Sequence, residues 1–132
     1  MDAQKPEVDS ALRWLQLQTL PGDEVLNPVD GYWWLGRDGE IPACFIGMTM
    51  TLTWPGAWYV ARCGVLPSYR GQKLQQRMLR TLERKAKEVG IERLISTTYC
   101  NPASANSFIA CGYKTYEPEG RWGALDTIYW LK

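Results

Sequence analysis

The stretch Val60-Ala61-Arg62-Cys63-Gly64-Val65-Leu66-Pro67-Ser68-Tyr69-Arg70-Gly71-Gln72-Lys73-Leu74-Gln75 decides how this chain folds. Its first half predicts a β-strand, and the turn formers Pro67 and Gly71 then interrupt the extended pattern. After Gly71 the chain predicts an amphipathic helix over residues 72–89, because apolar side chains recur there at helical spacing. The apolar positions of that helix are Leu74, Met78, Leu82, Ala86 and Val89.

A strand that turns tightly into a helix can bind an anion. The first N–H groups of a helix lack intrahelical acceptors and together carry about half a positive charge, so they favour phosphate groups. Arg70 and Lys73 add side-chain charge at the same place. We expect Gly64 to interrupt strand pairing by a bulge or a splay, which leaves backbone donors free beside an extended ligand. The simpler interpretation is a plain strand–turn–helix unit with solvated basic residues.

The rest of the chain predicts one α+β domain over residues 1–132. Asp38-Gly39 is a strong hairpin signal, and Pro55-Gly56 is typical of a type II turn. Met48, Met50, Leu52 and Trp54 alternate with threonines, which places them on one face of a strand. The predicted order is α-β-β-β-α-β-α-β-β, with a helix at 6–20, strands at 32–35, 43–54 and 58–65, a helix at 72–89, a strand at 91–99, a helix at 103–111, and strands at 113–117 and 125–131.

Composition excludes several kinds of catalysis. The 132 residues include no histidine, so a Ser-His-Asp triad, a Cys-His pair and a histidine-based metal site are all ruled out. The four cysteines show no CxxC spacing, and no metal site is expected. Proton transfer must therefore use carboxylates, Tyr, Lys, Cys, backbone groups or water.

Charge and hydropathy also limit the partners. Lys plus Arg number 15 and Asp plus Glu number 14, which argues against a nucleic-acid partner. Nothing in the sequence is apolar over the ~18 residues that a membrane helix needs, and the start does not resemble a signal peptide. We therefore expect a cytoplasmic protein with reduced cysteines and no membrane partner.

Two motifs carry a resemblance to a known family. The run Val65-x-Pro67-x-Tyr69-Arg70-Gly71 resembles motif A of the GCN5-related N-acetyltransferases, the GNAT family. The run Asn101-x-x-Ser104-x-x-x-Phe108-x-x-x-Gly112-Tyr113 is similar to motif B of that family, and the hairpin Asp38-Gly39-Glu40 resembles the segment before motif A. The resemblance covers roughly residues 30–132. It implies a GNAT-like central mixed, mostly antiparallel sheet flanked by helices.

The resemblance also implies acetyl-CoA as cosubstrate and an amine as acceptor. In the family, backbone amides of the loop after motif A hold the pyrophosphate, and the preceding strand pairs with the pantetheine arm. These roles carry over to Arg70, Gly71, Gln72, Lys73, Leu74 and Gln75 for the pyrophosphate and to Cys63 and Val65 for pantetheine. Asn101 and Phe108 would flank the thioester. The implied function is an N-acetyltransferase in which the amine attacks the thioester directly.

Three residues depart from the family pattern. Lys73 stands where the family usually has Gly, and Gln75 stands where it has Gly or Ala. Phe108 replaces a Tyr that in many members protonates the departing thiolate, so that role does not carry over. Tyr59 and Tyr99 are the catalytic candidates that remain, and Tyr69, Asp126 or a water relay could also move the proton. The alternative function is a non-catalytic acyl-CoA-binding or interaction module on the same fold.

The acceptor itself is not readable from the motifs, and it could be a small molecule or a protein. Aromatic residues near the first hairpin and in the last loop could form an acceptor pocket, although core packing is the favoured interpretation of most of them. The candidates are Tyr32, Trp33, Trp34 and Trp122. A homodimer is a further expected assembly.

Overall fold

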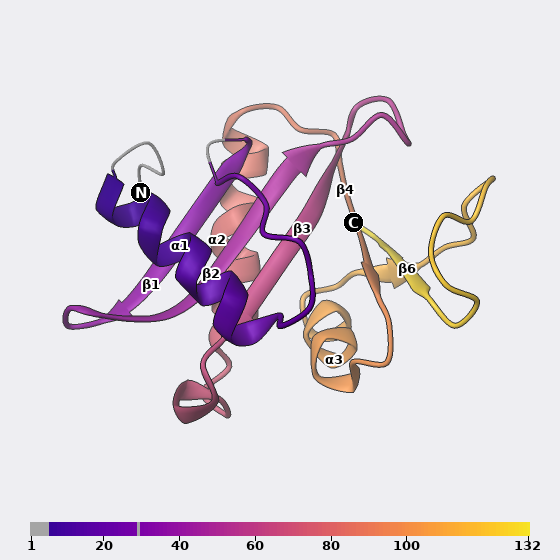
Figure 1. Cartoon of the computed structure of the whole chain (residues 1–132). Helices are drawn as coiled ribbons and strands as arrows, with labels where there is room; N and C mark the ends of the chain where they lie inside the picture. The colour runs from indigo at the N-terminus through magenta and orange to yellow at the C-terminus, as the bar shows by residue number, and fades with distance from the viewer. Residues whose placement is uncertain (1–5, 29) are drawn as a thin grey trace.

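The computed structural model describes residues 6–28 and 30–132 and shows a mixed sheet between helices. The sheet has six strands in the order β1-β2-β3-β4-β6-β5, with β3 and β4 parallel and all other neighbours antiparallel. This arrangement confirms the predicted fold class and element order (Figure 1). The elements are α1 (Pro6–Thr19), β1 (Tyr32–Asp38), β2 (Ile41–Met50), β3 (Ala57–Val65), the short 3-10 helix η1 (Pro67–Tyr69), α2 (Leu74–Glu88), β4 (Arg93–Thr98), α3 (Pro102–Ala110), β5 (Lys114–Thr115) and β6 (Ile128–Leu131).

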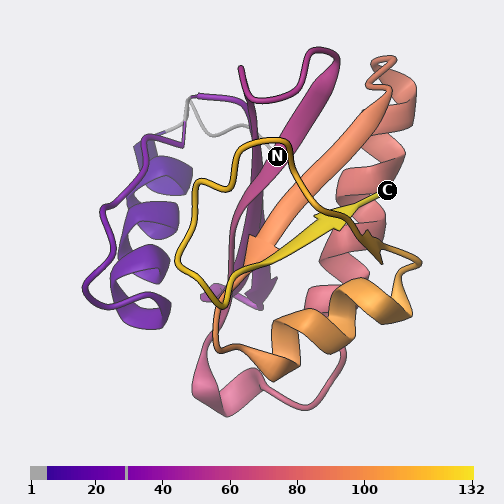
Figure 2. The ribbon, with the colours of Figure 1, turned by 90° about the vertical axis from the view of Figure 1, so that its right-hand side faces the viewer.

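The core lies on both faces of the sheet, because successive residues of a strand point to opposite faces. Phe45 faces α1 and Ile46 faces α2, and both are fully buried. Figure 2 shows α1 on one side of the sheet and α2 on the other. The helical positions predicted for α2 are confirmed where they matter most, since Met78, Leu82 and Ala86 are buried against the sheet. Each large buried side chain of this kind contributes roughly 1.5–3 kcal/mol.

The strands β3 and β4 separate soon after they begin to pair. Their parallel ladder covers only Ala57–Tyr59, and the register between β2 and β3 shifts so that Ala61 has no partner. Beyond this bulge the two strands diverge (Figure 1). The expectation that Gly64 causes the splay is wrong, because Gly64 stays paired with Phe45. Its missing side chain instead leaves room for Thr19 at the end of α1, which a Cβ would strike.

Three predicted strands also have wrong boundaries. The strand predicted over 43–54 ends at Met50, and Met50 and Leu52 are 74% and 99% exposed. Alternation alone does not bury a side chain, and pairing with β3 ends at Met50. The last two strands are shorter than predicted, so residues 116–127 form a loop between β5 and β6.

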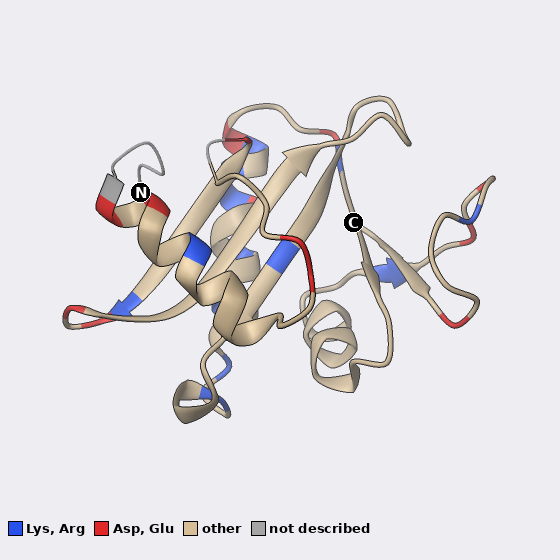
Figure 3. Cartoon of the chain, in the orientation of Figure 1, with Lys and Arg blue, Asp and Glu red and all other residues tan. Residues whose placement is uncertain are grey.

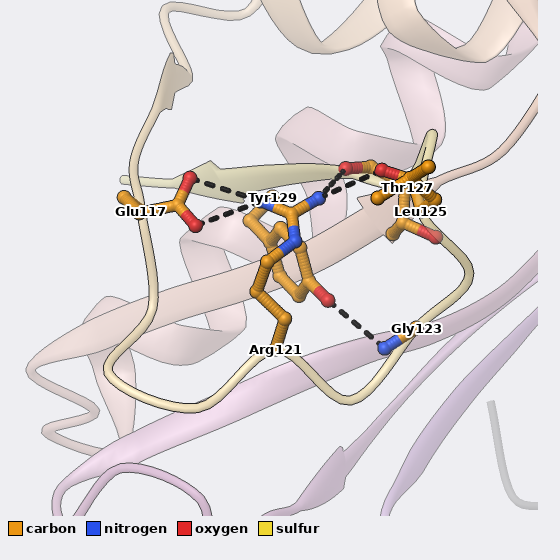
Figure 4. Close-up of polar contacts among 6 residues, drawn as sticks. All are labelled: Glu117, Arg121, Gly123, Leu125, Thr127 and Tyr129. Atoms are coloured by element: carbon orange, nitrogen blue, oxygen red, sulfur yellow. Dashed lines mark hydrogen bonds and ion pairs between the residues drawn. The ribbon is translucent and has the colours of Figure 1, made fainter.

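Arg121 organises the β5–β6 loop (Figure 4). Its guanidinium donates to both carboxylate oxygens of Glu117 at 2.8 and 2.9 Å and to the Thr127 carbonyl at 2.9 Å. The same group lies 4.8 Å from the centre of the Tyr129 ring, and the Tyr129 hydroxyl accepts from the Gly123 amide at 2.9 Å. The loop therefore has a defined shape, and it bends toward the α1 side of the sheet (Figure 2).

Candidate active site

The divergence of β3 and β4 leaves one edge of β3 open. In the described chain, no strand pairs with this edge beyond Tyr59. The Leu66 amide donates to the Ala43 carbonyl at 2.9 Å, so the backbone groups of Leu66 face β2. Because these groups alternate along a strand, those of Cys63 and Val65 face the open edge. These are the two residues for which the resemblance implies backbone pairing with a ligand.

The segment after β3 presents a run of free amides. The Arg70 amide donates to the Pro67 carbonyl at 3.4 Å. From Gly71 to Gln75, by contrast, no backbone amide has an acceptor within residues 6–28 and 30–132. Gly71 and Lys73 both have positive φ, +84° and +59°. Lys73 therefore keeps a left-handed conformation that usually favours glycine, although a side chain there costs about 1–2 kcal/mol. Lys73 thus has the backbone conformation that a glycine at this position would adopt most readily.

A first cleft of about 420 Å³ opens between this loop, the open edge of β3 and the start of α3. It brings together residues that lie far apart in the chain, from Thr19 to Ser107. Arg70 and Lys73 give the loop end of the cleft a positive charge. Figure 3 shows blue residues in the segment below β3. Of the residues to which the resemblance assigns a binding role, it gathers Cys63, Val65, Arg70, Gly71, Lys73, Leu74, Gln75 and Asn101. Gln72 lines a different cavity instead, on the α2 side of the sheet.

A second cleft of about 540 Å³ continues the first along the gap between β3 and β4. Both clefts are lined by Leu20, Cys63, Gln75, Asn101 and Ser104. Phe108 lines the second cleft, as do the two catalytic candidates Tyr59 and Tyr99. The two clefts thus form one channel, with free amides at one end and phenol hydroxyls at the other.

The wall between α2 and α3 is held by side-chain hydrogen bonds. The Gln75 amide group donates to the Ser104 hydroxyl at 3.0 Å and accepts from the Ser107 hydroxyl at 3.3 Å. Asn101 caps α3, since its side-chain oxygen accepts from the Ser104 amide at 3.1 Å. The departure from Gly or Ala at Gln75 therefore gives the chain a link between two helices that line the cleft.

The two tyrosines of the second cleft have different surroundings. The Tyr59 hydroxyl forms a 2.6 Å hydrogen bond with the Thr97 hydroxyl. Tyr99 is 56% exposed, and the neighbouring Cys100, followed by the Asp126 carboxylate, raises the pKa of its hydroxyl. Tyr99 therefore stays protonated at neutral pH and can donate a proton or a hydrogen bond.

Neither Phe108 nor Cys63 offers a reactive group. Phe108 is only 4% exposed and packs between Tyr113 and Trp130, with ring centroids 4.8 and 5.7 Å away. Burial raises the pKa of the Cys63 thiol far above its ordinary range, so the sulfur stays a neutral thiol. A thiol in that state is a poor acyl carrier, because the thiolate is the nucleophile.

One ion pair in the second cleft was missed by sequence reasoning. Asp23, in the loop after α1, accepts from the Arg62 guanidinium of β3 at 3.2 Å. Among the described residues, Asp23 is the only carboxylate that lines either cleft. The two residues are 39 positions apart, and no motif or periodicity links them, so no signal in the sequence could have paired them.

The predicted aromatic acceptor residues lie elsewhere. Trp33 is buried against Phe45, with ring centroids 6.1 Å apart, and Tyr32 packs on Trp58 at 5.4 Å. Neither they nor Trp34 and Trp122 line the two clefts. For Trp33 and Tyr32 the structure therefore has the favoured interpretation, core and cross-strand packing, whereas Trp122 is 44% exposed and Trp34 lines the cavity on the α2 side of the sheet.

The remaining tyrosine candidate, Tyr69, lines the first cleft rather than the second. Its hydroxyl donates to the Asp38 carboxylate at 3.0 Å, a contact that links the segment after β3 to the β1–β2 hairpin. The Tyr69 proton is therefore held by a neighbouring side chain.

Comparison with known proteins identifies the family. The model of the acetyltransferase (GNAT) family matches residues 3–113, so this chain belongs to that family. No curated protein sequence matches the chain. Its fold is similar to that of the ribosomal-protein-S18-alanine N-acetyltransferase from Escherichia coli, with a TM-score of 0.74 at 13% identity over 96% of this chain and 88% of that one.

Two further similar structures contain a coenzyme. An acetyltransferase from Bacillus subtilis in complex with CoA has a TM-score of 0.72 at 14% identity, covering 92% of this chain and 90% of that one. A GNAT family acetyltransferase from Elizabethkingia anophelis with acetyl-CoA bound has a TM-score of 0.71 at 15% identity, covering 89% and 86%. At these identities the likeness shows a shared fold.

Metal-binding clusters and membrane-spanning helices are both absent from the described residues. No group of three or more Cys, Asp or Glu side chains there could hold a metal ion. None of the helices in the same part of the chain combines the length and the apolar character needed to cross a lipid bilayer.

Proposed function

We propose that this chain is an acetyl-CoA-dependent N-acetyltransferase whose single domain moves the acetyl group directly to an amine. The observation that carries the proposal is the channel between β3 and β4, with free amides at one end and hydroxyls at the other. Membership of the GNAT family and the coenzymes held by similar structures support it.

The first cleft has the features that a nucleotide thioester needs. The free amides from Gly71 to Gln75 and the N-terminus of α2 are suited to the pyrophosphate, and Arg70 and Lys73 add charge. Cys63 and Val65 would pair with the pantetheine arm as a neighbouring strand does. Asn101, at the junction of the two clefts, would lie close to the thioester.

The chemistry then needs little from side chains. The amine nitrogen forms a bond to the thioester carbon, the carbon–sulfur bond breaks, and the CoA thiolate takes a proton. We assign that proton to Tyr99, because Tyr99 lines the second cleft and its hydroxyl is protonated at neutral pH. Tyr99 would replace the hydroxyl that Phe108 lacks. The acceptor ammonium loses one proton to water before the attack. The attacking nitrogen loses a second proton when the amide forms, and water carries this proton to the Tyr99 phenolate, which restores the hydroxyl. Tyr59 orients the acceptor through its hydroxyl.

Two measurements test the proposal. CoA at about 100 times its dissociation constant should stabilise the fold by about 2.7 kcal/mol, which a thermal shift assay detects. Acetyl-CoA should then release free thiol when a panel of primary amines is added. The absence of any stabilisation by CoA would contradict the whole proposal.

A non-catalytic acyl-CoA-binding module is the second candidate, favoured by the missing hydroxyl at Phe108. The two candidates differ in one result. A module binds CoA and releases no thiol with any amine or peptide, whereas an enzyme releases thiol in proportion to acetylated product.

A further inference from the structure

The second cleft has one charged pair, and its two members are unequally accessible. The side chain of Asp23 is 57% exposed, whereas that of Arg62 is only 18% exposed. A molecule that enters the cleft from solvent therefore meets the carboxylate more readily than the guanidinium. A cationic group can bind Asp23 there, while an anionic group would have to displace Asp23 to reach Arg62.

The loops on either side of this cleft are also acidic. Residues 20–31 contain no Lys or Arg, and Arg121 is the only basic residue among residues 116–127. Arg121 is already bound to Glu117 within its own loop (Figure 4). Asp126, in that loop, is near enough to the cleft to act on the Tyr99 hydroxyl. Figure 3 shows these two acidic loops apart from the basic segment below β3.

We propose that the acceptor is an amine with at least one further positive charge, and that Asp23 binds this second ammonium group. This inference rests on the proposed function, since it concerns the acceptor end of the same channel. One amine would lie near the thioester, beside Tyr99 and Asn101, while the other contacts the carboxylate. The ring of Tyr59, in the same cleft, can add a cation–π contact. A small polyamine and a lysine-rich peptide share this chemistry.

Calorimetric titration of the CoA-loaded protein tests the inference without requiring turnover. Spermidine should bind more tightly than butylamine, which has a single charge. The variant Asp23→Asn should weaken spermidine binding about three- to fivefold, the range of a partly exposed ion pair. Its matched control is Glu24→Gln, which removes the same charge from the next residue, one that does not line the cleft, and should change binding less than twofold.

Arg62 gives a prediction of opposite sign. The variant Arg62→Gln frees Asp23 from its partner, so spermidine should bind more tightly, provided that CoA still raises the melting temperature. Weaker binding of spermidine to that variant, or tighter binding of glutamate than of spermidine to the wild type, would show that the cleft recognises an anion. If the Asp23 and Glu24 variants weaken spermidine binding equally, Asp23 acts only through general electrostatic attraction and does not contact the ammonium group. That result would overturn the inference.

Two further experiments distinguish a small-molecule acceptor from a peptide, and a failure of the proposed function from a failure of this inference. A lysine-rich peptide titrated in place of spermidine shows whether the cation belongs to a polymer or to a small molecule. If CoA does not bind, the proposed function fails, and spermidine titrated into the free protein still tests Asp23. If thiol is released equally well with butylamine and spermidine, only the inference about the acceptor fails.

Discussion

At the scale of single residues, the second cleft is lined by a side chain that can donate a proton and by one that cannot. Tyr99 is exposed in the second cleft, and its pKa is raised by Cys100 and Asp126. Phe108 lines the same cleft from an aromatic cluster and has no proton to give. Phe108 lacks a hydroxyl, and Tyr99 presents one in the same cleft. Both facts are compatible with Tyr99 having taken over the role of proton donor.

The variant Tyr99→Phe should reduce kcat by about 100-fold or more while the CoA-induced thermal shift stays unchanged, because only proton donation is lost. The wild type should also lose activity at alkaline pH as Tyr99 deprotonates. Since the pKa of Tyr99 is raised, that loss should lie above the range of an ordinary tyrosine. The variant should lack this alkaline limb in a pH–rate profile.

Tyr32→Phe is the matched control, since Tyr32 packs on Trp58 and does not line the clefts. It should keep wild-type kcat and the alkaline limb. A Tyr99→Phe enzyme with full activity would remove Tyr99 from the mechanism and leave proton transfer to water.

At the scale of elements, the channel depends on how α2 and α3 are joined. Gln75 belongs to the first turn of α2 and bonds two serines of α3, while Asn101 caps α3 on the same side. These contacts add to the packing of both helices on the sheet, and together they hold the wall of the cleft.

The variant Gln75→Ala should lower the free energy of unfolding by about 1 kcal/mol, because two partly buried hydrogen bonds are lost. Urea unfolding measures this change. CoA should still bind, since the backbone amide remains. Gln76→Ala is the control in the same helical turn, away from the Gln75 bonds, and should change stability by less than about 0.5 kcal/mol. Equal losses in both variants would mean that the link to α3 adds no stability.

Sequence patterns predicted the helices better than the gap between the strands. The apolar face of α2 follows from Leu82 and its neighbours at regular spacing, because burial of one face sets that period. The splay depends on a bulge at Ala61 and on where pairing between β3 and β4 stops, which are properties of two distant segments. The pair of Asp23 and Arg62 escaped prediction for the same reason.

At the scale of the whole molecule, stability comes from a sheet that is covered on both faces. The exposed apolar residues in the segment after β2 contribute little to it. Leu82, on the face of α2 that packs on the sheet, is fully buried, whereas Leu52 is 99% exposed. A leucine side chain therefore contributes much to stability at position 82 and little at position 52, although both positions belong to clear apolar patterns in the sequence.

The variant Leu82→Ala should destabilise the protein by about 2–5 kcal/mol, because it removes buried methyl groups and leaves a cavity. Leu52→Ala should change the free energy of unfolding by less than about 0.5 kcal/mol. Denaturant unfolding followed by circular dichroism compares them. A large loss in the Leu52 variant would show that the turn after β2 is covered in solution.

The open edge of β3 has a consequence for solubility. Unpaired backbone groups at the rim of a sheet invite strands from other molecules, and proteins usually protect such rims with charge or proline. Here the backbone groups of Cys63 and Val65 on that edge pair with no strand of the described chain, although the Val65 carbonyl accepts from the Arg70 Nε at 3.3 Å. They lie inside the sheet, in a cleft bordered by the end of α1 and the start of α3. An approaching flat sheet would collide with those helices, whereas a single slender chain could enter. An extended ligand can therefore reach these backbone groups, whereas the strands of another protein molecule cannot pair with them and start aggregation.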